Sequence, residues 1–104
     1  MNYIGNAISL NMFDIGQGME IVVRPVPPQE VPNDAISAIG YEETASAASR
    51  SLGRTVEPNR INVKLKNGDV LFVFQHMGER LERTQKGLPE DPRWEWFEVK
   101  HKKS

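Results

Sequence analysis

The chain has 104 residues, and its 13 lysines and arginines nearly balance its 14 aspartates and glutamates. This length predicts a single domain over 1–104, small enough that a homodimer would help it to complete its core. The near-neutral charge argues against long nucleic acid as a partner, so any anionic ligand is expected to be small and held by local cations. Without cysteine, and with two dispersed histidines, the chain is expected to have no disulfide, metal or other cofactor. It shows no signal peptide and no apolar run of membrane-spanning length, so we expect a cytoplasmic location.

The first third of the chain predicts two strands and an extended segment. Residues 3–10 place isoleucine and leucine side chains at one parity and predict a strand, and the β-branched stretch 20–25 predicts another. Glycines between them, in 11–18, indicate a turn. Four prolines are expected to keep 25–33 extended and non-helical.

Residues 41–52 predict an α-helix. Two glutamates open this segment and an arginine lies in its last turn, which complements the helix dipole. Gly53 stands where a helix C-terminal glycine is expected. The apolar face repeats with the 3.6-residue period of a helix and comprises Tyr41, Ala45, Ala48 and Leu52.

Two further strands are expected in the middle of the chain. Residues 60–65 alternate in polarity, which predicts a half-exposed strand, and the following Asn67-Gly68 is a strong hairpin signal. Residues 70–74 are apolar at both parities, as in the central strand of a sheet.

The last quarter is expected to hold a loop, a strand and a frayed tail. Polar residues with glycine and proline over 78–93 indicate mostly loop, whereas 94–99 predict a strand whose tryptophans fill the core or a dimer contact. Residues 101–104 are expected to be disordered and exposed. The element order ββαβββ predicts an α/β (α+β) fold, with a mixed sheet of roughly five strands and the helix packed on it.

Five segments of the chain, taken together and in order, carry a family resemblance. They are Tyr3-Ile4-Gly5-Asn6-Ala7-Ile8-Ser9-Leu10-Asn11-Met12, Ser37-Ala38-Ile39-Gly40, Asn59-Arg60-Ile61-Asn62-Val63-Lys64-Leu65, Val73-Phe74-Gln75 and Arg80-Leu81-Glu82. In this order they resemble the viral ring-nuclease (anti-CRISPR) family of small archaeal-virus and phage proteins. The similarity extends over about residues 3–83.

The resemblance implies a homodimer with a pocket for cyclic tetra-adenylate, the second messenger of type III CRISPR defence, across its interface. Family members open this ring without metal, because a ribose 2′-hydroxyl attacks the adjacent phosphodiester and leaves a 2′,3′-cyclic phosphate. The reaction needs a base, an acid for the leaving 5′-oxygen, and cations for the phosphate.

The chain departs from the family in its catalytic residues. The family histidine that follows Ser-x-Ile-Gly is Tyr41 here, and tyrosine is a poorer proton donor near neutral pH. The family Arg-x-x-Glu corresponds to Arg80-Leu81-Glu82, in which the glutamate comes one residue early; counted from Gln75, Glu82 matches but Glu79 replaces the arginine. If the chain is active, Tyr41 and Glu82 are the catalytic candidates.

The binding residues that the resemblance implies are more complete. For each of them an ordinary structural role is also open: turn formation for the short polar residues, a solvated cation for Arg60, core packing for Tyr41 and a strand end for Gln75. In the functional interpretation Arg60 clamps a phosphodiester and Tyr41 stacks on a base or donates its hydroxyl. The ligand-binding candidates are Asn6, Ser9, Asn11, Gly40, Tyr41, Arg60, Gln75, Arg80 and Arg83.

Three functional hypotheses follow. The first is a viral binding protein that sequesters a cyclic oligonucleotide in the host cytoplasm without cleaving it. The second is a metal-independent ring nuclease that cleaves cyclic tetra-adenylate or a related ring. The third is a viral dimer that uses the same scaffold to bind DNA or a protein.

Overall fold

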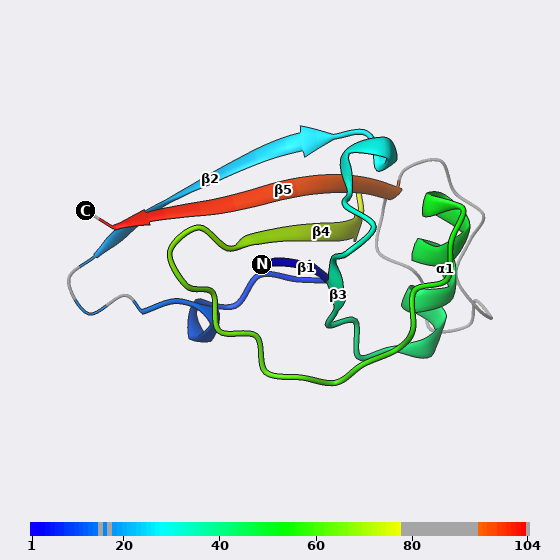
Figure 1. Ribbon diagram of the computed structural model, residues 1–104, viewed down its shortest axis with the longest axis horizontal. Helices are drawn as coiled ribbons and strands as arrows, with labels where there is room; N and C mark the ends of the chain where they lie inside the picture. The colour runs from blue at the N-terminus through cyan, green and yellow to red at the C-terminus, as the bar shows by residue number, and fades with distance from the viewer. Residues whose placement is uncertain (15, 17, 78–93, 104) are drawn as a thin grey trace.

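The computed structural model describes residues 1–14, 16, 18–77 and 94–103. Five strands form one mixed sheet in the order β2-β5-β4-β1-β3 (Figure 1). The mixed α+β fold with a five-stranded sheet and one helix, predicted from the sequence, is confirmed. The elements are β1 (Asn2–Gly5), η1 (Leu10–Met12), β2 (Met19–Val26), η2 (Pro28–Glu30), β3 (Ile36–Ser37), α1 (Glu42–Leu52), β4 (Val70–His76) and β5 (Trp94–Lys103).

The three strands β1, β3 and β4 are parallel, and β1 lies between the other two. Their carboxyl ends therefore meet at one end of the sheet, where α1 lies in Figure 1. The backbone N–H of Ala38 donates to the carbonyl of Ile4 at 2.7 Å, so the chain leaving β3 stays beside the end of β1. Such an end is where open α/β sheets commonly bind their ligands.

Two apolar clusters cover the two faces of the sheet. On one face Phe72, Phe74 and Trp96 meet the alanines of α1, whose small side chains let the helix approach closely. On the other face Leu71 and Val73 pack with residues from outside the sheet. Strand β4 is thus apolar on both faces, which confirms the central strand predicted at 70–74.

The helix also agrees with its sequence pattern. Ala45 and Ala48 are fully buried, and Gly53 ends the helix in the left-handed conformation with φ of +70°. The helix begins at Glu42, so Tyr41 precedes it and does not continue its apolar face.

The strand predicted at 60–65 is wrong. Val63 and Leu65 are buried while the alternate residues are exposed, so the expected alternation is present. However, this segment lies over the second face of the sheet and packs against the cluster that contains Leu71 and Val73. We call residues 60–65 the covering segment, and they form no strand pairing. Its backbone is tied instead to η1, where the N–H of Leu65 donates to the carbonyl of Met12 at 2.7 Å.

Three other local predictions need correction. Asn67-Gly68 does form a turn, with φ of +91° at Gly68, but it leads from the covering segment into β4 and makes no hairpin. The first strand ends at Gly5 because the chain then turns into η1. The segment 25–33 contains one helical turn, η2, which begins with a proline at a position where proline is tolerated.

The C-terminal tail is ordered through residue 103, contrary to the predicted disorder. Residues 101–103 continue β5 and pair with the start of β2. The His101 ring packs edge-on against Phe13 at 5.3 Å, and its Nε2 lies 3.0 Å from the carbonyl oxygen of Lys66. The pairing partner is distant in sequence, which hid this strand from a local pattern. The loop predicted at 78–93 lies outside the described residues.

Trp94 and Trp96 contribute to the core, as predicted. The Phe74 ring stacks on Trp94 at 4.5 Å and lies 4.7 Å from Trp96. The Trp96 indole N–H donates to the Ser51 hydroxyl of α1 at 2.9 Å, so this strand holds the helix by both packing and a hydrogen bond.

The start of β1 is fixed by an ion pair whose strength depends on pH. The N-terminal ammonium donates to Asp69 at 2.7 Å, and this bond, reinforced by the Lys66 backbone N–H, lowers the pKa of Asp69 below its usual 3.8. A lowered pKa stabilises the fold above the usual value, and the contribution is lost as pH falls through the lowered one. We expect Asp69→Asn to reduce the free energy of unfolding by about 0.5 kcal/mol at neutral pH, because the ammonium is mostly exposed.

Urea denaturation of both proteins at pH 7 and along an acid series measures this effect. The difference in stability between them should close as pH falls below about 4. A difference that is the same at all these pH values would contradict the assignment of the ion pair.

Within the described residues, no helix is long and apolar enough to cross a membrane.

Candidate functional site

Gly40, Tyr41 and Arg60 come together at the carboxyl end of the parallel strands. The Arg60 Nε donates to the carbonyl of Gly40 at 3.0 Å, and its guanidinium carbon lies 5.5 Å from the centre of the Tyr41 ring. This is the geometry of a cation–π contact. Tyr41 is 59% exposed, so the alternative that it packs in the core is wrong.

Glycine at position 40 is explained by this contact. A Cβ built there would lie 2.9 Å from the Arg60 Cγ, closer than real Cβ contacts. The residue before Arg60 is fixed as well, because the Asn59 N–H donates to the Ile39 carbonyl at 2.7 Å and its side-chain amide to the Ser37 carbonyl at 2.8 Å. The backbone thus holds Arg60 beside the residues that follow β3, and its bond to Gly40 uses Nε and not the two terminal Nη groups.

Ser9 and Asn11 lie at a second location, beside residues 61–64 of the covering segment. They belong to a groove of about 270 Å³ that we call the Ser9–Lys64 groove, lined by Ser9, Asn11, Met12, Ile61, Asn62, Val63 and Lys64. The Ser9 hydroxyl caps η1 by accepting from the backbone N–H of Asn11 at 3.3 Å. The predicted turn role of Ser9 is therefore real, and it leaves the hydroxyl proton free to donate.

Lys64 is a site residue that the sequence analysis missed. Its Nζ donates to the Asn11 carbonyl at 2.6 Å, which places an ammonium at the edge of the groove. The alternation of 60–65 could have indicated Lys64, because Arg60, Asn62 and Lys64 lie on the same exposed side of the segment. Only Arg60 stood out, because it matched the resembled family.

Residues 2–91 match the family model described as STIV B116-like. The chain belongs to the STIV B116-like family. Among solved structures it is similar to B116 of Sulfolobus turreted icosahedral virus (STIV), with a TM-score of 0.72 and 22% sequence identity. The similarity covers 95% of this chain and 97% of that one, so the two share a fold over nearly their whole length. A comparison with curated protein sequences found no match.

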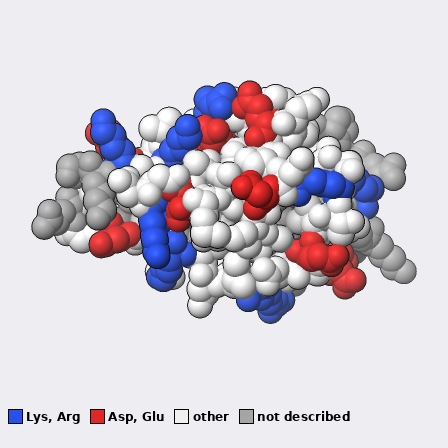
Figure 2. Space-filling model, viewed as in Figure 1, with Lys and Arg blue, Asp and Glu red and all other residues white. Residues whose placement is uncertain are grey.

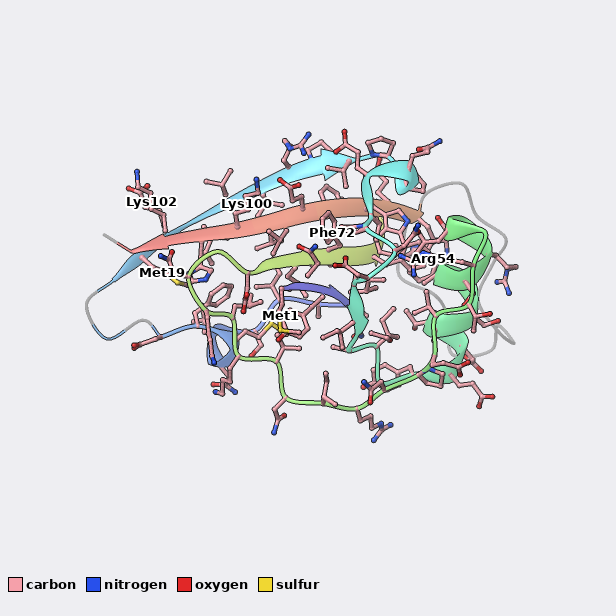
Figure 3. The ribbon with its side chains drawn as sticks, in the orientation of Figure 1. Met1, Met19, Arg54, Phe72, Lys100 and Lys102 are labelled. Carbon is pink, nitrogen blue, oxygen red and sulfur yellow. The ribbon has the colours of Figure 1, made fainter. Side chains whose placement is uncertain are left out.

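On this B116-like fold, two cations away from the site are paired with carboxylates. Arg24 contacts Glu30 at 3.1 Å and Glu98 at 3.3 Å, which raises its pKa, chiefly through the bond to Glu98. Lys100 lies 3.4 Å from Glu98 on the part of β5 that Figure 3 shows away from α1. In Figure 2 positive and negative side chains alternate over this face, so it carries no broad basic patch.

Arg60 and Lys64 differ from these two cations in their partners and resemble Arg54, which donates to the Pro32 carbonyl at 2.6 Å. Each donates to a backbone carbonyl, and within the described residues neither forms an ion pair with a carboxylate. Among the residues that the structure describes, no carboxylate neutralises their positive charge. Cations in this state are suited to bind an anionic ligand.

The remaining candidates are scattered. Asn6 is half-buried just after β1, and Gln75 is exposed on β4, where it lies opposite Glu95. Among the described residues, no contact joins Gln75 to the cluster of Gly40, Tyr41 and Arg60 or to the Ser9–Lys64 groove. The candidates Arg80, Glu82 and Arg83 lie outside the described residues.

Proposed function

We propose that this chain is a viral anti-defence protein that binds and sequesters a cyclic oligonucleotide second messenger. The observation that carries the proposal is the Arg60 arrangement, in which Gly40 and Tyr41 hold a guanidinium that forms no ion pair with a carboxylate of the described part of the chain. A fixed guanidinium suits the bidentate binding of a phosphodiester. Membership of a family named after a viral protein supports the viral origin.

The Ser9–Lys64 groove supplies what a nucleotide ring needs besides a phosphate contact. The hydroxyl of Ser9 and the amides of Asn11 and Asn62 can donate to and accept from base edges or ribose hydroxyls. The exposed ring of Tyr41 offers a surface on which a base can stack. The ligand is then held by one strong charged contact and several adaptable polar contacts.

Binding without cleavage is favoured by the residue type at position 41. Tyr41 stands where the resembled family has its histidine, and a tyrosine is a poorer proton donor than a histidine near neutral pH. We therefore place the metal-independent ring nuclease, with Tyr41 and Glu82 as its catalytic residues, second to sequestration.

We further propose that a second copy of the chain completes the pocket. Several large apolar side chains near the site are exposed, namely Ile8, Leu10, Tyr41 and Ile61. Leu10 is 62% exposed between Ser9 and Asn11, and Ile61 lines the groove itself. A partner subunit that covers these residues would close an otherwise open groove around the ligand.

The test incubates the purified protein with a panel of cyclic di-, tri-, tetra- and hexanucleotides and measures depletion of each ring from solution. The protein is then denatured and the released nucleotide is identified by mass-resolved chromatography. Recovery of one intact ring is expected. Recovery of a linear product would establish the nuclease instead, and retention of no ring would leave the DNA- or protein-binding hypothesis. Sedimentation equilibrium on the same sample measures the dimer.

A further inference from the structure

Lys64 provides a second cation in the candidate site, at a different place from Arg60. The two residues are joined by the covering segment, and four residues of extended chain span up to about 13 Å. Their side chains are held apart, since Arg60 donates to Gly40 at the end of β3 and Lys64 donates to Asn11 in η1. Charge-assisted hydrogen bonds require heavy atoms within about 3 Å of each other. Lys64 lines the Ser9–Lys64 groove and Arg60 does not, so we assign the two cations to separate contacts with a ligand.

We propose that Lys64 binds a second phosphate of the same ligand, so that the site selects molecules with at least two separated phosphates. The inference rests on the proposed function and adds to it a requirement on the ligand. The ammonium of Lys64 has three N–H donors, and the Asn11 carbonyl takes one of them. The remaining donors lie at the Ser9–Lys64 groove, beside polar groups that can hold the sugar or base between the two phosphates.

The arrangement also separates the two contacts by chemistry. The planar guanidinium of Arg60 fixes the orientation of its phosphate, whereas the ammonium of Lys64 acts as a point charge that tolerates several orientations. A ligand can thus be oriented at the Arg60 end while rings that differ in size reach Lys64. A nucleoside monophosphate can use only one of these contacts.

The experiment measures binding of cyclic tetra-adenylate by isothermal titration calorimetry at several salt concentrations. In Lys64→Gln we expect about a fivefold to tenfold loss of affinity and a salt slope reduced by about 0.7, as for one lost phosphate contact on a single strand. Lys64→Arg keeps the charge and should restore most of the affinity. The matched control is Lys102→Gln, which removes an exposed lysine from β5 and should change neither quantity.

A double variant with Arg60→Lys tests whether the two cations bind different phosphates. For separate phosphates the losses of affinity multiply, whereas residues that share one phosphate couple strongly. Adenosine monophosphate, as a second probe, should bind Lys64→Gln and the native chain alike. An unchanged affinity and salt slope in Lys64→Gln, while the native chain binds the ring, would overturn this inference alone. If the native chain binds no ring of the panel, the proposed function fails and this inference fails with it.

Discussion

The Arg60→Lys variant is expected to bind its cyclic oligonucleotide about tenfold to a hundredfold more weakly than the native chain. A lysine keeps the positive charge but has no separate Nε and Nη donors. It therefore cannot contact the Gly40 carbonyl and hold a phosphate bidentately at the same time. One charge-assisted hydrogen bond contributes about 1.5–3 kcal/mol, which corresponds to the loss given above.

Calorimetry with the ring that the native chain retains measures this loss. Arg24→Lys is the matched control, because Arg24 is an exposed arginine that is paired with Glu30 and Glu98 away from the site. This control should bind as the native chain does. Equal affinities of Arg60→Lys and the native chain would exclude Arg60 as the phosphate contact.

The Phe74→Ala variant is expected to lose about 3–5 kcal/mol of the free energy of unfolding. Phe74 is 1% exposed in the central strand, and its ring contacts both Trp94 and Trp96. Its removal leaves a cavity that the neighbouring indoles cannot fill without leaving their strand positions. Small domains have about 5–15 kcal/mol in total, so this variant is expected to be only marginally folded.

Urea denaturation followed by tryptophan fluorescence measures the change in stability. Phe74→Leu keeps most of the volume and should lose much less. Tyr41→Ala removes another aromatic ring, but an exposed one, and should change stability by no more than about 0.5 kcal/mol. A loss below about 1 kcal/mol in Phe74→Ala would contradict the position of Phe74 in the core.

Predictions that rest on local periodicity were the most accurate. The alanine face of α1 and the apolar run of β4 can each be recognised as buried from a short stretch of sequence. Both elements lie where they were predicted. The alternation at 60–65 predicted burial correctly but pairing wrongly. Alternation reports that one side of an extended segment is buried, and this is equally true of a strand and of a segment that covers a sheet.

The site was only partly predictable, for the same reason. Arg60 and Gly40 were named through a resemblance, yet their contact depends on the fold, which brings residues 20 positions apart to 3.0 Å. Tyr41 fits the helical period, but the helix begins one residue later, and that single position decides whether the ring is buried or exposed. Lys64 shares the exposed parity of Arg60. Nothing in the sequence, however, distinguished it from a lysine that is only solvated.

The order of the strands in the sheet determines how much of the chain must be synthesised before each strand can pair. β1 is enclosed by β3 and β4, with Asn2 opposite Val70, and β2 pairs with β5, with Met19 opposite Lys103. A nascent chain can thus pair β1 with β3 early, whereas β2 has no partner until β5, the last strand, has been synthesised. Such non-local pairing slows folding to about milliseconds or longer. Translation that stops before residue 94 would leave β2 and one side of β4 as open edges, prone to pair with other chains.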